Sequence, residues 1–281
     1  MPKTNLKIVH RNEHKGLRDF RQGRINTRKE FVRQNVIRRN LERLAFKQIR
    51  AVFSKFVNTQ AYLIKEFNLY DVDTATRDLD AELLPVMYMH YKKVYRTIFS
   101  MNENNYDKIK KSEEALVFGR NMDIEDLIDI YNRNRLLYLT NISVSMAKRI
   151  ERIITEGREE GLSLTQLAEK ISDKVLPIGR SRAALIARTE THNAASFANH
   201  QYHEILKKDL DINMMKKWVA TSDLRTRSAH IDANGQIRQM DEPFEVGGTA
   251  MMHAGDPNGG AKNNVNCRCV IVYADSQDIV L

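Results

Sequence analysis

The spacing of apolar residues predicts a long helix that begins at Glu30. Apolar side chains recur every three or four positions, and basic residues fill the positions between them, as in an amphipathic helix with a basic outer face. The positions assigned to the inner face are Phe31, Ile37, Leu41, Leu44, Gln48, Val52 and Phe56. Residues 1–29 lack this periodicity and hold nine basic residues, so we expect a flexible, basic N-terminal arm that becomes ordered only on a partner.

Two more long helices are expected before residue 160. The first covers about residues 78–100, with Pro85 near its start, where proline is tolerated. The second begins near Asp123, where acidic residues supply a cap and a negatively charged first turn, and it continues to Gly157. Helices of this length in a chain of 281 residues favour a bundle or a stalk.

The sequence between residues 163 and 208 predicts two helices with a break between them. Ser163 and Gln166 have the spacing of a capping box, which opens a short helix. Pro177 and Gly179 are expected to end this helix. A second helix, rich in alanine in its first half, is expected over residues 181–208.

The pattern changes after Asp209, where short strand-like runs replace the helical period. Residues 217–220 and 269–273 are candidate strands, and Asn234-Gly235 is a strong hairpin signal. Residues 247–266 are rich in glycine and asparagine and are expected to form a loop.

Together these patterns predict a mainly α fold. Long helices are expected to form an elongated helical body, followed by a small α+β C-terminal module with a β-hairpin. The expected divisions are the arm (1–29), the helical body (30–175) and the C-terminal module (176–281).

The basic residues are concentrated at the N-terminus. Residues 1–60 hold 16 Lys and Arg against 4 Asp and Glu, whereas the whole chain has a net charge of only +9. Such a block is typical of a segment that meets a polyanion, and DNA, RNA or an acidic protein surface would fit; a solvated helix face is the simpler interpretation. The residues proposed to contact nucleic acid are Arg33, Arg38, Arg39, Arg43, Lys47 and Arg50.

Composition excludes several classes of protein. No run of about 18 apolar residues is present, so no membrane span is expected, and the N-terminus has no apolar segment of a secretory signal. Two cysteines cannot form a disulfide scaffold, and we expect them to be thiols.

Both cysteines stand in one Cys-x-Cys segment near the C-terminus. Cys267 and Cys269 would share a face of a strand, and thiolates are soft ligands that suit zinc. Two further ligands could come from His230 with His253 or Asp223. The alternative is a pair of small buried side chains beside a hydrogen-bonded His230, so we expect either no cofactor or one structural zinc ion.

Catalytic motifs are weak. His230, Asn234 and His253 loosely resemble the His-Asn-His nucleases, but the spacing does not fit, and a metal-dependent nuclease or hydrolase is kept only as the alternative function. Arg188 and Glu190 suggest an ADP-ribosyltransferase, yet no Glu-x-Glu pair accompanies them, and an ion pair is the more usual role. No phosphate-binding glycine loop or metalloprotease motif is present, so we predict that the chain is not an enzyme.

The order of motifs in the last hundred residues is specific in combination. A helix with Arg188-Thr189-Glu190 precedes Trp218, then an Asp223-x-Arg225-x-Arg227-x-x-His230 segment, and finally Asn266-Cys267-Arg268-Cys269. Over about residues 180–275 this order resembles the Mu F-like domain of phage head morphogenesis proteins. Within such a module, the residues to which we assign a structural knot are Arg188, Glu190, Trp218, Asp223, Arg225 and Arg227.

The resemblance implies a minor capsid protein of a tailed bacteriophage. Such a protein would bind the portal protein, and also major capsid or scaffold protein, inside the head, and would aid assembly and DNA packaging or ejection. Its expected location is the virion interior near the portal, and the host cytoplasm during assembly, without membrane contact. Double-stranded DNA would meet the N-terminal basic region. Some members of the family carry an added enzyme domain behind the module; only six residues follow Asp275, so none is expected here.

Overall fold

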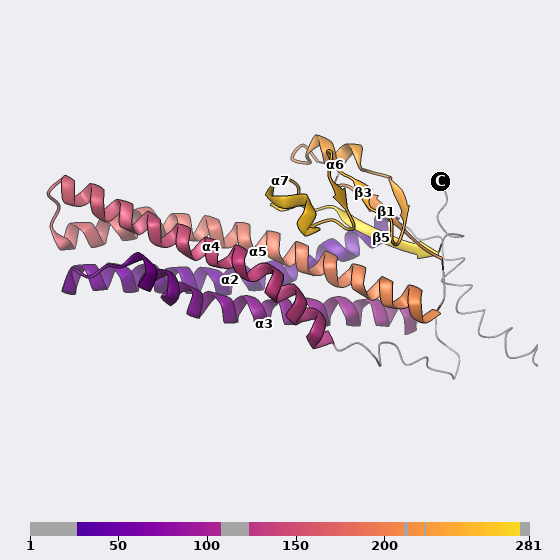
Figure 1. Ribbon diagram of the computed structural model, residues 1–281, viewed down its shortest axis with the longest axis horizontal. Coiled ribbons are helices and arrows are strands. Elements are labelled where there is room, and N and C mark those ends of the chain that lie inside the picture. The colour runs from indigo at the N-terminus through magenta and orange to yellow at the C-terminus, as the bar shows by residue number, and fades with distance from the viewer. Residues whose placement is uncertain (1–26, 108–123, 211–212, 222, 276–281) are drawn as a thin grey trace, which may run out of the picture. The chain divides into compact units, whose positions relative to one another are not determined.

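Four long helices dominate the fold (Figure 1). The computed structural model describes residues 27–107, 124–210, 213–221 and 223–275. The long helices are α2 (Thr27–Phe67), α3 (Val72–Asp107), α4 (Ile124–Glu159) and α5 (Leu164–Leu210). Short strands and helices follow α5, so the predicted class, a mainly α protein with a small α+β C-terminal module, is confirmed. The expected N-terminal arm lies almost wholly outside the described residues.

The described chain separates into two compact units. The first, which we call the helical unit, contains residues 39–93 and 125–191. The second, which we call the mixed unit, contains residues 27–38, 94–107, 124 and 192–275, apart from the positions left undescribed. Because α2, α3 and α5 each supply residues to both units, the division does not follow the predicted boundary at residue 176, and the three predicted parts stay a prediction.

The helical unit has a core built from one face of each helix. On α2 the buried residues are Leu41, Ala45, Ile49, Val52, Phe53, Phe56, Val57, Gln60, Ala61 and Ile64. The sequence pattern had placed Leu44 and Gln48 inward, yet Leu44 is only half-buried and Gln48 is exposed. The buried face of α2 is wider than one residue per turn and passes through Ala45 and Ile49. A small residue such as Ala45 fits where helices pack closely.

Helix α5 is continuous, so the predicted break at Pro177 and Gly179 is wrong. Pro177 is exposed, so its ring faces solvent, and the Ser181 hydroxyl donates to the Pro177 carbonyl at 3.2 Å. A Cβ added to the buried Gly179 would lie 3.3 Å from Cβ of Phe53, so this glycine permits close approach of α2 rather than a turn. The capping box at the start of α5 is confirmed, because Ser163 and Gln166 exchange hydrogen bonds of 2.9 and 3.3 Å.

The other helix starts differ modestly from expectation. Helix α3 begins at Val72, six residues before the predicted start, so Pro85 lies well inside it rather than near its start. Helix α4 covers Ile124–Glu159, close to the predicted range. None of the helices in the described ranges is long and apolar enough to span a bilayer.

The mixed unit contains a three-stranded antiparallel sheet in the order β2-β1-β5. The strands are β1 (Met214–Val219), β2 (Ile237–Gln239) and β5 (Val270–Asp275). Met214, Lys216 and Trp218 are buried and alternate with half-buried neighbours, as expected for a central strand. Both strands predicted from sequence, at residues 217–220 and 269–273, are therefore present with small shifts.

The hairpin of the C-terminal module lies elsewhere than its strongest sequence signal. Asn234-Gly235 follows the short helix α6 (Ser228–Asp232), and it turns the chain into β2 instead of joining two strands directly. Gly235 has a φ of +84°, which glycine adopts readily. The hairpin is formed by β3 (Phe244–Glu245) and β4 (Ala250–Met251).

The predicted loop at residues 247–266 is partly regular. It includes β4, the 3-10 helix η1 (Pro257–Gly259) and the short helix α7 (Gly260–Asn264). Asp256 stabilises this segment, since its carboxylate accepts hydrogen bonds from the backbone N–H groups of Met252 at 2.6 Å and of Asn258 at 2.9 Å. The segment therefore gains its order from side-chain caps, which hydrophobic periodicity does not reveal.

Candidate functional site

Three potential metal ligands of the mixed unit converge. His230 lies on α6, and Cys267 and Cys269 lie in the segment that leads into β5. Nδ1 of His230 is 3.3 Å from Sγ of Cys269 and 3.6 Å from Sγ of Cys267, and the ligand atoms of all three lie within 4.8 Å of one another. Each side chain is at most 3% exposed. The structure thus brings together three of the four residues that the sequence suggested for zinc.

His253, the fourth suggested ligand, is not in this group. Its buried ring lies against His200 and Phe197, with centroid separations of 5.2 and 5.8 Å. Burial, together with the neighbouring His200, lowers the pKa of His253 to about 4. A neutral, aromatic packing role therefore describes this histidine in the structure.

The backbone before the cysteines is bent to aim their side chains. Asn266 adopts a φ of +58°, a left-handed conformation that asparagine tolerates better than most residues. The Cys267 backbone N–H donates to the Asn264 carbonyl at 3.2 Å, and the Arg227 guanidinium donates to the Val265 carbonyl at 2.5 Å. This bend explains the asparagine of the Asn-Cys-Arg-Cys motif.

The two thiols differ in acidity because they face each other. A hydrogen bond from Cys267, together with the nearby His230, lowers the pKa of Cys269 to about 5. The same contact with Cys269, together with burial, raises the pKa of Cys267. The contact between the two sulfurs therefore favours a thiolate at Cys269 over one at Cys267.

Arg38 supports the cysteine segment from α2. Its guanidinium donates to the carbonyls of Cys269 at 3.2 Å and Arg268 at 3.1 Å, and it also contacts Nδ1 of His192. Arg38 is 7% exposed, so the sequence-based assignment of this residue to a nucleic-acid surface does not fit the structure. Helical spacing did not predict the burial of Arg38, because this residue makes polar contacts to the segment that carries the cysteines.

The remaining residues of the expected knot make separate contacts in the mixed unit. The Asp223 carboxylate binds the Arg268 guanidinium through two hydrogen bonds, one of them 2.8 Å, and Arg268 strongly lowers the pKa of Asp223. Trp218 is fully buried and packs edge-on against Phe244 and His230, at centroid distances of 5.4 and 5.7 Å. The Arg225 backbone N–H donates to Asp223 at 3.0 Å, while its residue is exposed.

Arg188 and Glu190 make their observed contacts within the helical unit. Arg188 donates to Glu42 at 3.1 Å. Glu190 is fully buried, and its carboxylate accepts hydrogen bonds from the Arg135 guanidinium, at 3.0 Å from Nε, and from the Tyr91 hydroxyl at 2.7 Å. Their proposed bracing of the C-terminal module stays a prediction. Sequence reasoning missed Arg135 and Tyr91, since neither stands out from its helical pattern.

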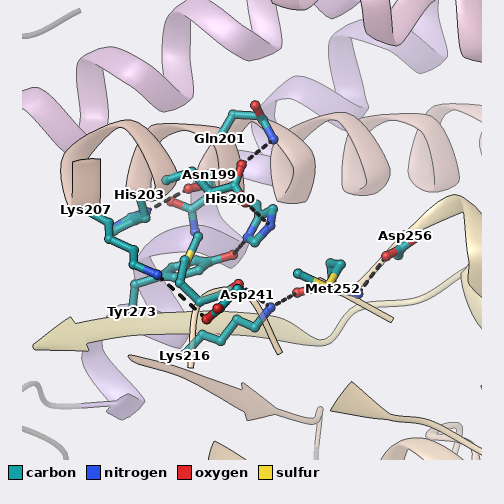
Figure 2. A network of polar contacts seen from close by, with 12 residues as sticks. Asn199, His200, Gln201, His203, Lys207, Lys216, Asp241, Met252, Asp256 and Tyr273 are labelled. Atoms are coloured by element: carbon teal, nitrogen blue, oxygen red, sulfur yellow. Dashed lines mark hydrogen bonds and ion pairs between the residues drawn. The ribbon is translucent and has the colours of Figure 1, made fainter. Parts of the chain in front are cut away.

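A second polar network surrounds the buried Lys216 of β1 (Figure 2). Its ammonium group donates to the carbonyls of Met240 at 3.0 Å and Met252 at 2.9 Å, and it lies 5.2 Å from the Phe244 ring centroid. Burial lowers the pKa of Lys216 to about 8. The lysine thus joins the strand to the segments at residues 240 and 252, and nothing in the sequence pattern indicated this role.

Four of the proposed nucleic-acid contacts form one exposed row on α2. Arg39, Arg43, Lys47 and Arg50 are exposed, and their spacing of four, four and three places them on one helix face in the helical unit. We call these four residues the basic row. Arg33 differs, because it is half-buried and paired with Glu30 at 2.8 Å.

Comparison with known proteins gives one family match. A family described as Phage Mu protein F like protein matches residues 148–272. The match begins inside α4, so it includes the end of that helix and all of α5, and it is longer than the signature that the motifs define at about residues 180–275. No solved structure matches the chain.

Three relatives share part of the chain. The minor head protein GP7 of Bacillus phage SPP1 is 29% identical over 208 residues, covering 67% of this chain and 65% of that protein. The NAD(+)–arginine ADP-ribosyltransferase EFV of Enterococcus faecalis is 33% identical over 129 residues, covering 45% and 26%. The uncharacterized protein YqbB of Bacillus subtilis is 30% identical over 129 residues, covering 43% and 40%.

The chain therefore spans less than two thirds of the length of each of these relatives. The similarity to GP7 covers too much of the chain to be confined to the C-terminal module, so it includes part of the helices before residue 176.

Proposed function

We propose that the chain is a minor head protein that acts in the head morphogenesis of a tailed phage, because residues 148–272 match the family described as Phage Mu protein F like protein. The observation that carries this proposal is the extent of the similarity to the SPP1 minor head protein, which covers 67% of the chain and therefore cannot be confined to the C-terminal module. Within that role we propose a position inside the head, in contact with the portal protein.

A structural role suits the candidate catalytic residues better than catalysis. Glu190 is fully buried and held by Arg135, so it is not available to a substrate. His230 and the two cysteines are also buried, which argues against their use as a nuclease centre. The match to the Enterococcus ADP-ribosyltransferase covers 26% of that protein, so it does not by itself bring that protein's named activity to this chain.

The composition of purified particles tests the proposed function. Mass spectrometry of proheads, mature virions and particles after genome ejection, all from the phage that encodes the chain, should find it in proheads and virions at few copies. A tagged chain expressed with the portal protein should retain that protein through purification. Absence of the chain from both proheads and virions would contradict a head role.

We further propose that the basic row contacts packaged DNA. Its four cations repeat at about 6 Å along α2, given the helical rise of 1.5 Å per residue, so several can face one polyanion at once. Residues 1–29 add nine basic side chains to the same end of the sequence. Attraction of this kind is independent of DNA sequence and weakens with salt.

Replacing Arg39, Arg43, Lys47 and Arg50 by glutamine should weaken binding of double-stranded DNA. Each lost phosphate contact should reduce the slope of log K against log salt by about 0.9. Fluorescence anisotropy of a labelled duplex at several salt concentrations measures both quantities. The matched control replaces four basic residues that are exposed on α4 and α5, namely Lys148, Arg152, Lys174 and Arg180. Equal effects of the two variants would show that total charge, and not the basic row, controls binding.

A further inference from the structure

We propose that His230, Cys267 and Cys269 bind one zinc ion through Nδ1 and the two Sγ atoms. The proposal concerns the mixed unit alone and does not depend on the head role. The three residues come from two segments, α6 and the turn before β5, that are 37 to 39 positions apart in the chain. Their ligand atoms already lie within 4.8 Å of one another.

The distances fit a tetrahedral site. With Zn–S near 2.3 Å and Zn–N near 2.0 Å, a tetrahedral angle places a sulfur and a nitrogen ligand about 3.5 Å apart. The two observed separations from Nδ1 of His230 are 3.3 and 3.6 Å. Both nitrogen-to-sulfur separations therefore match the value that such a site requires.

One hydrogen bond cannot explain both contacts. A single imidazole N–H can be directed at one sulfur, yet Nδ1 of His230 faces two sulfurs at nearly equal distance. A cation placed among the three atoms would bind all of them at once. A neutral imidazole and two thiolates are also a ligand set that zinc accepts, since soft thiolates favour it.

The segment that carries the two cysteines is held in place by Arg38 of α2. The Arg38 guanidinium holds the carbonyls of Cys269 and Arg268, which fixes the cysteine segment from outside the ligand set. Partners of this kind orient metal ligands in known sites.

The burial of the three ligands, rather than their number, favours a structural role for the site. Its three protein ligands are at most 3% exposed, which leaves no open path for a large substrate. One of the four zinc positions would take a further donor, such as a water molecule. The ion would tie α6 to β5 across a region with only short strands and helices, where packing alone supplies little regular structure.

Metal content of the purified full chain tests this proposal. Inductively coupled plasma mass spectrometry measures the zinc content of two samples. One is protein prepared without added metal, and the other is the same protein after incubation with zinc and removal of the excess. We expect about one zinc per chain in the incubated sample. Replacement by cobalt should give thiolate-to-cobalt charge-transfer absorption together with the visible bands of tetrahedral Co²⁺. Chelator treatment should lower the melting temperature, and zinc should restore it.

Variants separate the site from other metal-binding groups. Cys267→Ser, Cys269→Ser and His230→Gln should each lower the zinc content to below about one-tenth of an equivalent, while His203→Gln, a half-buried histidine of the same unit, should keep it. If a ligand variant fails to fold, the wild-type cobalt spectrum still decides. A folded wild-type chain that takes up neither zinc nor cobalt, or whose mass shows a Cys267–Cys269 disulfide under reducing purification, would overturn the proposal.

Discussion

Replacing Glu190 by glutamine is expected to lower the free energy of unfolding of the helical unit by about 3–5 kcal/mol. The glutamine removes the negative charge but keeps the shape, so the buried Arg135 guanidinium loses its counter-charge. The Arg135 side chain is 14% exposed and that of Glu190 is 0% exposed, so water cannot replace the lost partner. The Tyr91 hydroxyl would also lose a charged acceptor. Urea denaturation followed by far-UV circular dichroism measures the change.

A second ion pair that involves α5, here with α2, gives the matched control. Arg188 and Glu42 are paired at 3.1 Å, but their side chains are 40% and 26% exposed. Glu42→Gln should therefore cost less than about 1 kcal/mol. Replacing both Arg135 and Glu190 by methionine should recover much of the loss, because no unpaired charge then stays buried. A Glu190→Gln variant as stable as Glu42→Gln would show that the buried pair does not carry the expected energy.

Acidification from pH 7 to pH 4.5 is expected to destabilise the protein strongly. Burial lowers the pKa of His90 and of His253 to about 4 and holds that of His192 well below its usual value. In the unfolded chain these groups titrate near 6.5, so below that pH the unfolded state binds more protons than the folded state. Stability is thus fully present above pH 6.5 and is lost as the pH falls towards 4. Each histidine with a pKa near 4 contributes roughly 3 kcal/mol to the total loss, at 1.36 kcal/mol per unit.

Two signals can follow this transition in different parts of the chain. Trp218, the single tryptophan, is fully buried in the mixed unit, so its fluorescence reports on that unit. Far-UV circular dichroism follows the helices. His253→Gln should flatten the pH dependence of the tryptophan signal between pH 6.5 and 4.5, whereas His90→Gln should not flatten it to the same extent. Equal urea midpoints at pH 7 and pH 4.5 would contradict the expected role of buried neutral histidines.

Long periodic segments were predicted best, because helical spacing is a property of the local sequence. The positions of α2 and α4 followed from it, and the capping box at Ser163 marked the start of α5. The break at Pro177 was wrong because an exposed proline can remain in a helix that tertiary packing stabilises on both sides. The inner face of α2 was partly misassigned since Arg38 and Gln34 are buried by polar contacts to the segment at residues 268–271.

The candidate site was only partly predictable. The Cys-x-Cys spacing and His230 were visible in the sequence, but the choice of a further ligand depended on tertiary arrangement, and His253 lies against other rings instead. The partners of Glu190 could not be inferred, because they lie 55 and 99 positions away from it in the chain. The same holds for Lys216, whose hydrogen-bond partners lie 24 and 36 positions away. Contacts between residues so far apart in the chain produce no periodic pattern in a single sequence.

Side chains alternate between the two faces of β1, so the neighbouring Lys216 and Lys217 differ in how easily a reagent in solution reaches their amines. Lys216 is fully buried with both of its observed hydrogen bonds to carbonyls, whereas Lys217 is half-buried at the other face of the strand. An amine-specific label therefore modifies Lys217 in the native protein and reaches Lys216 only after the sheet opens. The ratio of label on these adjacent positions therefore measures how often this part of the sheet opens locally.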